Sequence, residues 1–164
     1  GTSHSCAVLH TGGVRCWGEG LFLGHGNDRQ VDGPQIDITG DVPVGAPVSD
    51  VVIGGDHTCA LLRSGSVRCW GSGLFGRLGY NSTDGVANVV GDVSIQQAGS
   101  ISDLPGVLQI SAHSAGAHTC ALLDSISIRC WGFGRRGRLG YGSTADVGDS
   151  PSTSIGAAGN VQVW

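Results

Sequence analysis

The sequence predicts an all-β fold made of three tandem copies of one hairpin unit. Three observations carry this prediction. One short pattern recurs three times, each copy holds two apolar, β-branched runs around a turn, and glycine makes up 30 of the 164 residues. Glycine at this frequency, beside only 5 prolines, indicates many tight turns between short strands. A chain of this length is expected to form a single unit over residues 1–164.

Each copy begins with a His-Ser/Thr-Cys-Ala run and returns through an Arg-Cys-Trp-Gly run. The copies extend over residues 4–18, 57–71 and 118–132, and the spacing inside them does not vary. Because a short turn separates the two runs, each copy is predicted to be a β-hairpin. A glycine-rich stretch follows, and its fullest form is Gly73-Leu-Phe-Gly-Arg-Leu-Gly-Tyr80.

A further apolar run precedes the second and third hairpins, at residues 50–53 and 107–110. The first hairpin lacks one, and the same pattern stands at the other end of the chain, at Val161-Gln-Val-Trp164. We therefore expect repeats at about 1–48, 49–106 and 107–159, with 160–164 as the first strand of a further repeat. Val161, Val163 and Trp164 are predicted to form an inter-chain strand that completes the first hairpin of another copy, head to tail.

These patterns resemble the regulator of chromosome condensation repeat. The resemblance is carried by Val52–Leu62, Trp70-Gly71, Gly76-Arg-Leu-Gly79 and Val90-Gly-Asp92. Members of that family form β-propellers, so the resemblance implies propeller blades, with the chain starting inside a blade. Since family members typically have seven blades and this chain has material for three, we expect a partial propeller or one completed by another chain.

The six cysteines fall into three pairs, each separated by ten positions. The pairs are Cys6 with Cys16, Cys59 with Cys69, and Cys120 with Cys130. The members of a pair lie opposite each other across a hairpin, so the geometry permits a disulfide in every repeat. Buried free thiols in a reducing compartment are the alternative. The even number and the repeated register favour disulfides, and hence a secreted protein with an extracellular or cell-surface location.

The recurring histidines and tryptophans are predicted to be structural. They are His4, His57 and His118, and Trp17, Trp70 and Trp131. The histidines are expected to bond loop backbone inside their own blades, and the tryptophans to pack between blades. A catalytic or ligand role for the histidines and carbohydrate stacking by the tryptophans are the alternatives. Zinc held by His57, Cys59 and Cys69 is disfavoured because no fourth ligand has a fitting position, so neither metal nor cofactor is expected.

The remaining motifs favour binding over catalysis. No nucleophile motif or phosphate loop occurs, and the chain has a single glutamate, so an enzyme is not expected. A net charge of −4 disfavours nucleic acid, and no apolar run approaches the about 20 residues of a membrane-spanning helix. Asn81 opens an Asn-Ser-Thr sequon, a candidate glycosylation site. Arg135, Arg136 and Arg138 form a basic cluster that could contact an anionic glycan or an acidic partner, and a solvated loop is the alternative.

We therefore expect a non-enzymatic extracellular binding or structural module whose loops contact protein or glycan. Self-association or membership of a longer parent chain is expected as well. The alternative is a regulator of an enzyme, similar to propellers that act as small-GTPase exchange factors or as enzyme inhibitors.

Overall fold

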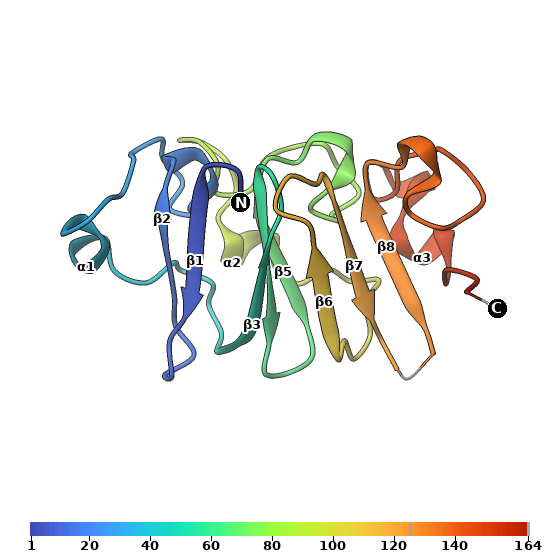
Figure 1. Ribbon diagram of the computed structural model, residues 1–164, viewed down its shortest axis with the longest axis horizontal. Helices are drawn as coiled ribbons and strands as arrows, with labels where there is room; N and C mark the ends of the chain where they lie inside the picture. Colours follow the sequence, from blue (N-terminus) through green and yellow to red (C-terminus); the bar gives the residue numbers. More distant parts are fainter. Residues whose placement is uncertain (125, 164) are drawn as a thin grey trace.

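A computed structural model describes residues 1–124 and 126–163 and shows three antiparallel sheets standing side by side (Figure 1). The first blade contains β1 (His4–Val8), β2 (Val14–Gly18), η1 (Gly20–Phe22) and α1 (Gln35–Thr39). The second contains β3 (Val48–Ile53), β4 (His57–Leu62), β5 (Val67–Gly71), η2 (Leu74–Gly76) and α2 (Ile95–Ala98). The third contains β6 (Gln109–Ala112), β7 (His118–Leu122), β8 (Ile128–Gly132), η3 (Arg135–Gly137), η4 (Pro151–Thr153) and α3 (Ile155–Ala158). The predicted all-β partial propeller is confirmed.

The predicted hairpins are β1–β2, β4–β5 and β7–β8, and their registers are equivalent. Strands β3 and β6 add a third strand to the second and third sheets, on the side of β4 and β7 away from the hairpin partner. Strand β4 is buried along its whole length because it has a partner on each side and a blade on each face. The second blade therefore forms the centre of the core.

In each blade, an irregular segment lies beside the second strand of the hairpin (β2, β5 or β8), in place of a long fourth strand. Single bridges join Gly18 to Val31, Gly71 to Val86 and Gly132 to Val147. Further along, the backbone N–H groups of three more residues donate to the same strands: Val42 to Val14 O, Ile101 to Val67 O and Val161 to Ile128 O, at 2.7–2.9 Å. Each blade thus closes in the same way.

The bonding of Val161 corrects one expectation. Val161 takes the place in the third blade that Val42 and Ile101 take in the first and second, whereas the sequence placed residues 160–164 on the first strand of a further blade. The physical reason is that its N–H already bonds Ile128 O within this chain. Val163 is in no strand, and Trp164 lies outside the described residues.

Short helices close the blades, and the sequence analysis did not predict them. Helices α2 and α3 each bury one isoleucine completely, Ile95 and Ile155. Helix α2 begins with a capping box, in which Ser94 Oγ accepts the Gln97 N–H and Gln97 Oε1 accepts the Ser94 N–H. Capping supports a helix too short to be stable alone.

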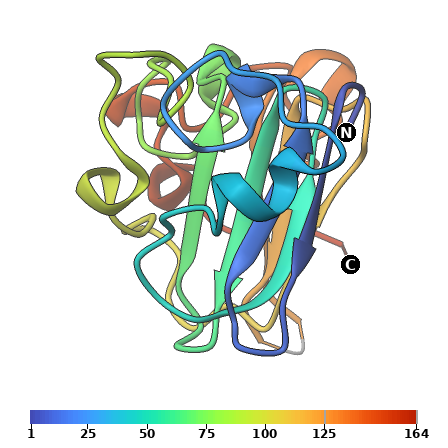
Figure 2. The ribbon, with the colours of Figure 1, turned by 90° about the vertical axis from the view of Figure 1, so that its left-hand side faces the viewer.

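The two ends of the blades differ. All hairpin turns point to one end, and η1, η2 and η3 gather at the opposite end, which we call the loop end (Figure 1). Figure 2 shows the molecule turned by 90° about the vertical axis, and in this view the three sheets stand one behind another. Loops from neighbouring blades therefore meet at the loop end, where a propeller can present a joint surface.

Candidate binding surface and blade junctions

All six cysteines form the expected cross-strand disulfides. The paired Cα atoms lie 4.1, 4.1 and 4.0 Å apart in the first, second and third blades. Each disulfide links opposite residues of one hairpin, as the register shows. The hairpins, on which the loops depend for their position, are thereby held covalently.

The recurring histidines join neighbouring blades. His4 Nε2 lies 2.9 Å from Thr58 Oγ1, and His57 Nε2 lies 2.9 Å from Thr119 Oγ1. The expected bonds to loop backbone within one blade are therefore wrong for His4 and His57, because each ring reaches across to the first strand of the next hairpin. A hydroxyl residue follows the histidine in every copy, and this was the sequence signal for the contact.

A glycine makes room for the His57 ring. A Cβ atom at Gly54 would lie 2.0 Å from the ring, so any side chain there would displace the imidazole. Burial lowers the pKa of His57 to about 3, with a smaller contribution from the charge of Arg77, and burial likewise lowers the pKa of His4 to about 4. Both rings are neutral at physiological pH, which suits a structural bond better than acid–base catalysis.

Two of the three recurring tryptophans, Trp70 and Trp131, pack between blades, whereas Trp17 is half-buried. Trp70 and Trp131 are completely buried. A Cβ atom at Gly24 would lie 2.8 Å from the Trp70 ring, and one at Gly79 would lie 3.1 Å from Trp131 Nε1, so each ring rests on a glycine of the preceding blade. The Trp131 N–H also donates to the Arg77 carbonyl at 3.1 Å. Such rings have no free face for stacking on carbohydrate.

The arginine before each second cysteine makes a third contact between blades. Arg68 Nη1 donates to the Val44 carbonyl at 2.6 Å, and Arg129 Nη1 donates to the Asp103 carbonyl at 2.7 Å. Each of these carbonyls belongs to the preceding blade.

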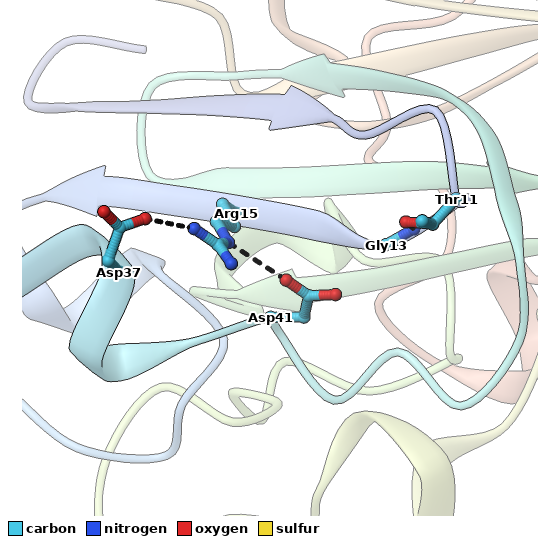
Figure 3. A network of polar contacts seen from close by, with 5 residues as sticks. All are labelled: Thr11, Gly13, Arg15, Asp37 and Asp41. Atoms are coloured by element: carbon cyan, nitrogen blue, oxygen red, sulfur yellow. Dashed lines mark hydrogen bonds and ion pairs between the residues drawn. The ribbon is translucent and has the colours of Figure 1, made fainter.

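Arg15, at the same position in the first blade, behaves differently. Its Nη1 pairs with Asp37 of α1 and its Nε with Asp41, at 3.1 Å (Figure 3). The hydrogen bond to Asp41 and the pairing with Asp37 raise the pKa of the Arg15 guanidinium. Arg15 thus pairs with residues of its own repeat, whereas Arg68 and Arg129 donate to the preceding blade.

An aromatic pair lies at the loop end, with Phe75 exposed and Phe133 half-buried. The rings of Phe75 and Phe133, from neighbouring blades, have centroids 4.5 Å apart. The guanidinium of Arg77 lies 5.5 Å from the Phe75 centroid, and that of Arg138 lies 4.9 Å from the Phe133 centroid. Phe75 is 39% exposed, and Leu74 beside it is 56% exposed. We call Leu74, Phe75, Phe133, Arg135, Arg136 and Arg138 the loop-end patch.

The backbone of this patch is strained. Phe75 has φ 63° and Arg136 has φ 65°, and both occupy the same position of the glycine-rich stretch. Left-handed backbone is uncommon for residues other than glycine and is a genuine outlier for a bulky one. Such strain gathers at binding sites, where the surrounding structure holds a side chain in an exposed position.

The arginines in and beside the loop-end patch differ in their partners. Arg77 is buried and bonds Asp56 at 3.0 Å. Arg135, Arg136 and Arg138 are exposed, and none of them forms an ion pair within the described residues. The predicted basic cluster therefore lies beside the aromatic pair, a proximity that the sequence analysis missed because Phe133 does not recur between copies.

Other predicted or excluded sites have simpler outcomes. Asn81 is half-buried with φ 59° on the loop after η2, and its glycosylation stays a prediction. Within residues 1–124 and 126–163, no three His, Cys, Asp or Glu side chains are grouped to hold a metal ion. In the same residues, no helix has the length and hydropathy to span a membrane.

Comparison with known proteins identifies the repeat. Residues 48–77 match the regulator of chromosome condensation (RCC1) repeat. The human E3 ubiquitin-protein ligase HERC2 is 31% identical over 148 residues, and the X-linked retinitis pigmentosa GTPase regulator homolog of Caenorhabditis elegans is 38% identical over 81 residues. These alignments cover 88% and 48% of this chain but 3% and 6% of the relatives.

A solved structure agrees on the fold. Yeast RCC1 (Prp20), in its complex with Kap60, superimposes with a TM-score of 0.63 and 19% identity. The alignment covers 98% of this chain and 35% of that chain. The chain therefore matches about a third of that propeller.

Proposed function

The chain is built from repeats of the regulator of chromosome condensation family, and from this premise we propose that it is a non-enzymatic module that binds a protein through its loop end. The observation that carries the proposal is the loop-end patch, in which exposed Leu74 and Phe75 lie with half-buried Phe133 and are bordered by exposed arginines. Aromatic residues and arginine dominate the energetic centres of protein interfaces. A structural neighbour, yeast Prp20, is solved bound to the protein Kap60.

The charge of the patch favours an acidic partner. Arg135, Arg136 and Arg138 stand on one short segment, whereas the chain as a whole carries a net charge of −4. A segment rich in Asp and Glu, with one apolar side chain to contact Phe75, would complement both features. Exposed arginines pair with carboxylates through two parallel hydrogen bonds.

The test uses fluorescence anisotropy with labelled synthetic peptides. We expect an acidic peptide containing phenylalanine to bind, and the double variant Arg135→Glu/Arg136→Glu to weaken the affinity at least tenfold. The control is Arg63→Glu, which makes the charge change of one of these two substitutions on the exposed hairpin turn at the opposite end. Equal affinity for a basic peptide, or an equal loss of affinity in the control variant, would refute binding of an acidic protein segment. Tighter binding of a sulfated oligosaccharide would show instead that the patch binds a glycan.

The proposed location is extracellular or on the cell surface. Its support is the disulfide in each blade, since disulfides persist in oxidising compartments and are rare in the cytosol. Thiol alkylation of the protein in its source cells, followed by mass spectrometry, measures this directly. Full alkylation of the six cysteines without prior reduction would place the protein in a reducing compartment.

A second candidate function is the regulation of an enzyme. It is favoured by the relative named as a GTPase regulator homolog, which aligns with about half of this chain. Release of a fluorescent guanine nucleotide from a panel of small GTPases is the assay. Acceleration that the Arg135→Glu/Arg136→Glu variant abolishes would favour this function over simple binding.

A further inference from the structure

A cavity of about 390 Å³ lies in the middle blade, between the loop that follows η2 and the segment around helix α2. Its lining residues all fall between positions 79 and 102, so a single blade forms it, and that blade has a neighbour on each side (Figure 1). The volume falls in the range of small-molecule sites, about 300–1,000 Å³. The residues of the loop-end patch do not line it, so this cavity is separate from the proposed protein-binding surface.

Amide, hydroxyl and carboxylate groups line the cavity together. They belong to Asn81, Ser82, Asp84 and Ser100. The Ser82 hydroxyl donates to Asp84 Oδ2 at 2.7 Å, and a carboxylate held in this way can accept further hydrogen bonds. Asn81 Oδ1 is buried and has no hydrogen-bond partner within the described residues, although buried polar atoms nearly always have one. Rotation about the terminal bond of Asn81 can bring either its oxygen or its nitrogen to face a ligand.

Tyr80 and two valines give the cavity an apolar wall. The Tyr80 hydroxyl accepts the Cys69 N–H at 3.0 Å and donates to the Gly99 carbonyl at 3.1 Å, so the ring is fixed between β5 and the end of α2. Val86 is buried, whereas Val93 is 50% exposed although it is apolar. Because this wall is held in place before a ligand arrives, little ordering is required on binding.

Asn81 and Asp84 differ from the residues at the same positions of the repeat. Gly26 and Gly142 occupy the position of Asn81 in the first and third blades, and the three residues have φ 59°, 68° and 69° in the order Asn81, Gly26, Gly142. Ala145 occupies the position of Asp84 in the third blade. The loop therefore adopts the same backbone in the third blade with neither polar side chain, and the fold of the blade does not require them.

The lining groups select the class of ligand. Among the described residues that line the cavity, only Asp84 is charged, so anions such as phosphate are repelled. A calcium ion takes about six to eight oxygen ligands, usually with several carboxylates, and a single aspartate does not provide these. A sugar ring is neutral, and its hydroxyl groups donate to a carboxylate and accept from an amide while its C–H groups pack on an apolar wall. We propose that the cavity binds one neutral sugar ring, with Asn81 and Asp84 bonding its hydroxyl groups.

Titration of the isotope-labelled chain with sugars, followed by two-dimensional amide NMR spectra, tests this site. The probes are glucose, galactose, mannose and N-acetylglucosamine, each as the free sugar and as its methyl glycoside, and mass spectrometry confirms that Asn81 is unmodified. We expect saturable shifts for the amides of residues 80–86 with at least one probe. Equal affinity for the glycoside would identify the end of a glycan as the ligand, and loss of binding on methylation would identify a free sugar.

Two variants and a matched control assign the binding to these side chains. Asp84→Ala should weaken the affinity about tenfold or more, because it removes a bond to a charged group, and Asn81→Gly should weaken it less. Each introduces the residue that the third blade has at that position. The matched control is Asp28→Ala, which removes the same charge from the exposed equivalent loop of the first blade.

Three results would overturn the proposal. They are the absence of shifts with every probe, full affinity in Asp84→Ala, and an equal loss of affinity in the control. Shifts of the same amides with calcium chloride and not with sugars would count against it as well. Dispersed amide spectra show that each variant is folded. The Arg135→Glu/Arg136→Glu variant should leave the sugar titration unchanged, so this proposal and the proposed function fail separately.

Discussion

His57 shows how a buried titratable residue can be structural. Its ring lies against Gly54, bonds the Thr119 hydroxyl on the next blade and is fully buried. Desolvation keeps the ring neutral, and the neutral ring has one N–H and one acceptor nitrogen with which to bond a hydroxyl. The junction between blades therefore depends on the protonation state of this residue.

The free energy of unfolding should decrease as the pH is lowered below about 6.5. The unfolded-state pKa is near 6.5, whereas burial lowers the folded-state pKa of His57 to about 3, so the unfolded state takes up the proton first. Above pH 6.5 both states are neutral, and below it the free energy of unfolding declines by about 1.4 kcal/mol per pH unit for this histidine until the folded pKa is reached. His57→Gln should reduce the slope, measured by urea unfolding at several pH values. An unchanged slope, or an equal change in His10→Gln on the exposed hairpin turn, would contradict this assignment.

Thr119 should be sensitive to loss of its hydroxyl alone. Thr119→Val keeps the shape but leaves a buried His57 nitrogen without its partner, which should cost about 1–3 kcal/mol of unfolding free energy. Thr119→Ser retains the hydroxyl and should lose less. Urea unfolding of both variants measures the difference, and equal losses would show that packing, rather than the bond, governs this position.

The residues that recur could be predicted as structural, but their partners could not. Sequence spacing gives the distance between residues within one hairpin, so the cysteine pairs were predictable. The contact of His57 with Thr119 depends on how neighbouring blades stack, which local spacing does not determine. The contact between Phe75 and Phe133 likewise joins two blades, and Phe133 gave no sequence signal because it does not recur between copies.

At the scale of elements, each hairpin is a covalently closed loop. Closing a loop of this size stabilises the fold by about 2–3 kcal/mol, chiefly by restricting the unfolded chain. Cys59→Ala/Cys69→Ala should therefore lower the free energy of unfolding by about this much, plus the cost of a cavity, because both cysteines are completely buried. Cys6→Ala/Cys16→Ala should lose less, because Cys6 is only half-buried.

Denaturant unfolding of both double variants provides the comparison. A larger loss in the first blade than in the second would contradict the argument from burial. Reduction of the unmodified chain without a shift in its midpoint would show that the disulfides contribute nothing.

The hairpins followed from apolar runs and turns, and the remaining elements did not. Strands β3 and β6 were visible as apolar runs, although β3 begins at Val48, before the run expected at residues 50–53. Helices α2 and α3 have four residues each, too few for a helical period to appear in the sequence. Val161 was placed on the wrong strand because its apolar pattern is shared by two different positions of the repeat.

At the scale of the whole molecule, the arc behaves as a linear array in which each blade contacts only its neighbours. In such arrays stability is the sum of blade and junction contributions. Within residues 1–124 and 126–163 the middle blade has two junctions and each of the other two blades has one, so the middle blade should open least often.

Hydrogen exchange measured by mass spectrometry tests this gradient. Strand β4 has a hydrogen-bonded strand on each side and is buried throughout, whereas β1 pairs only with β2 among the described strands. In β1, alternate amides point away from β2 and lack a ladder partner, so they should exchange faster than those of β4. Equal protection of β1 and β4 would mean that the three blades unfold as one unit, and that the junctions are as strong as the sheets they connect.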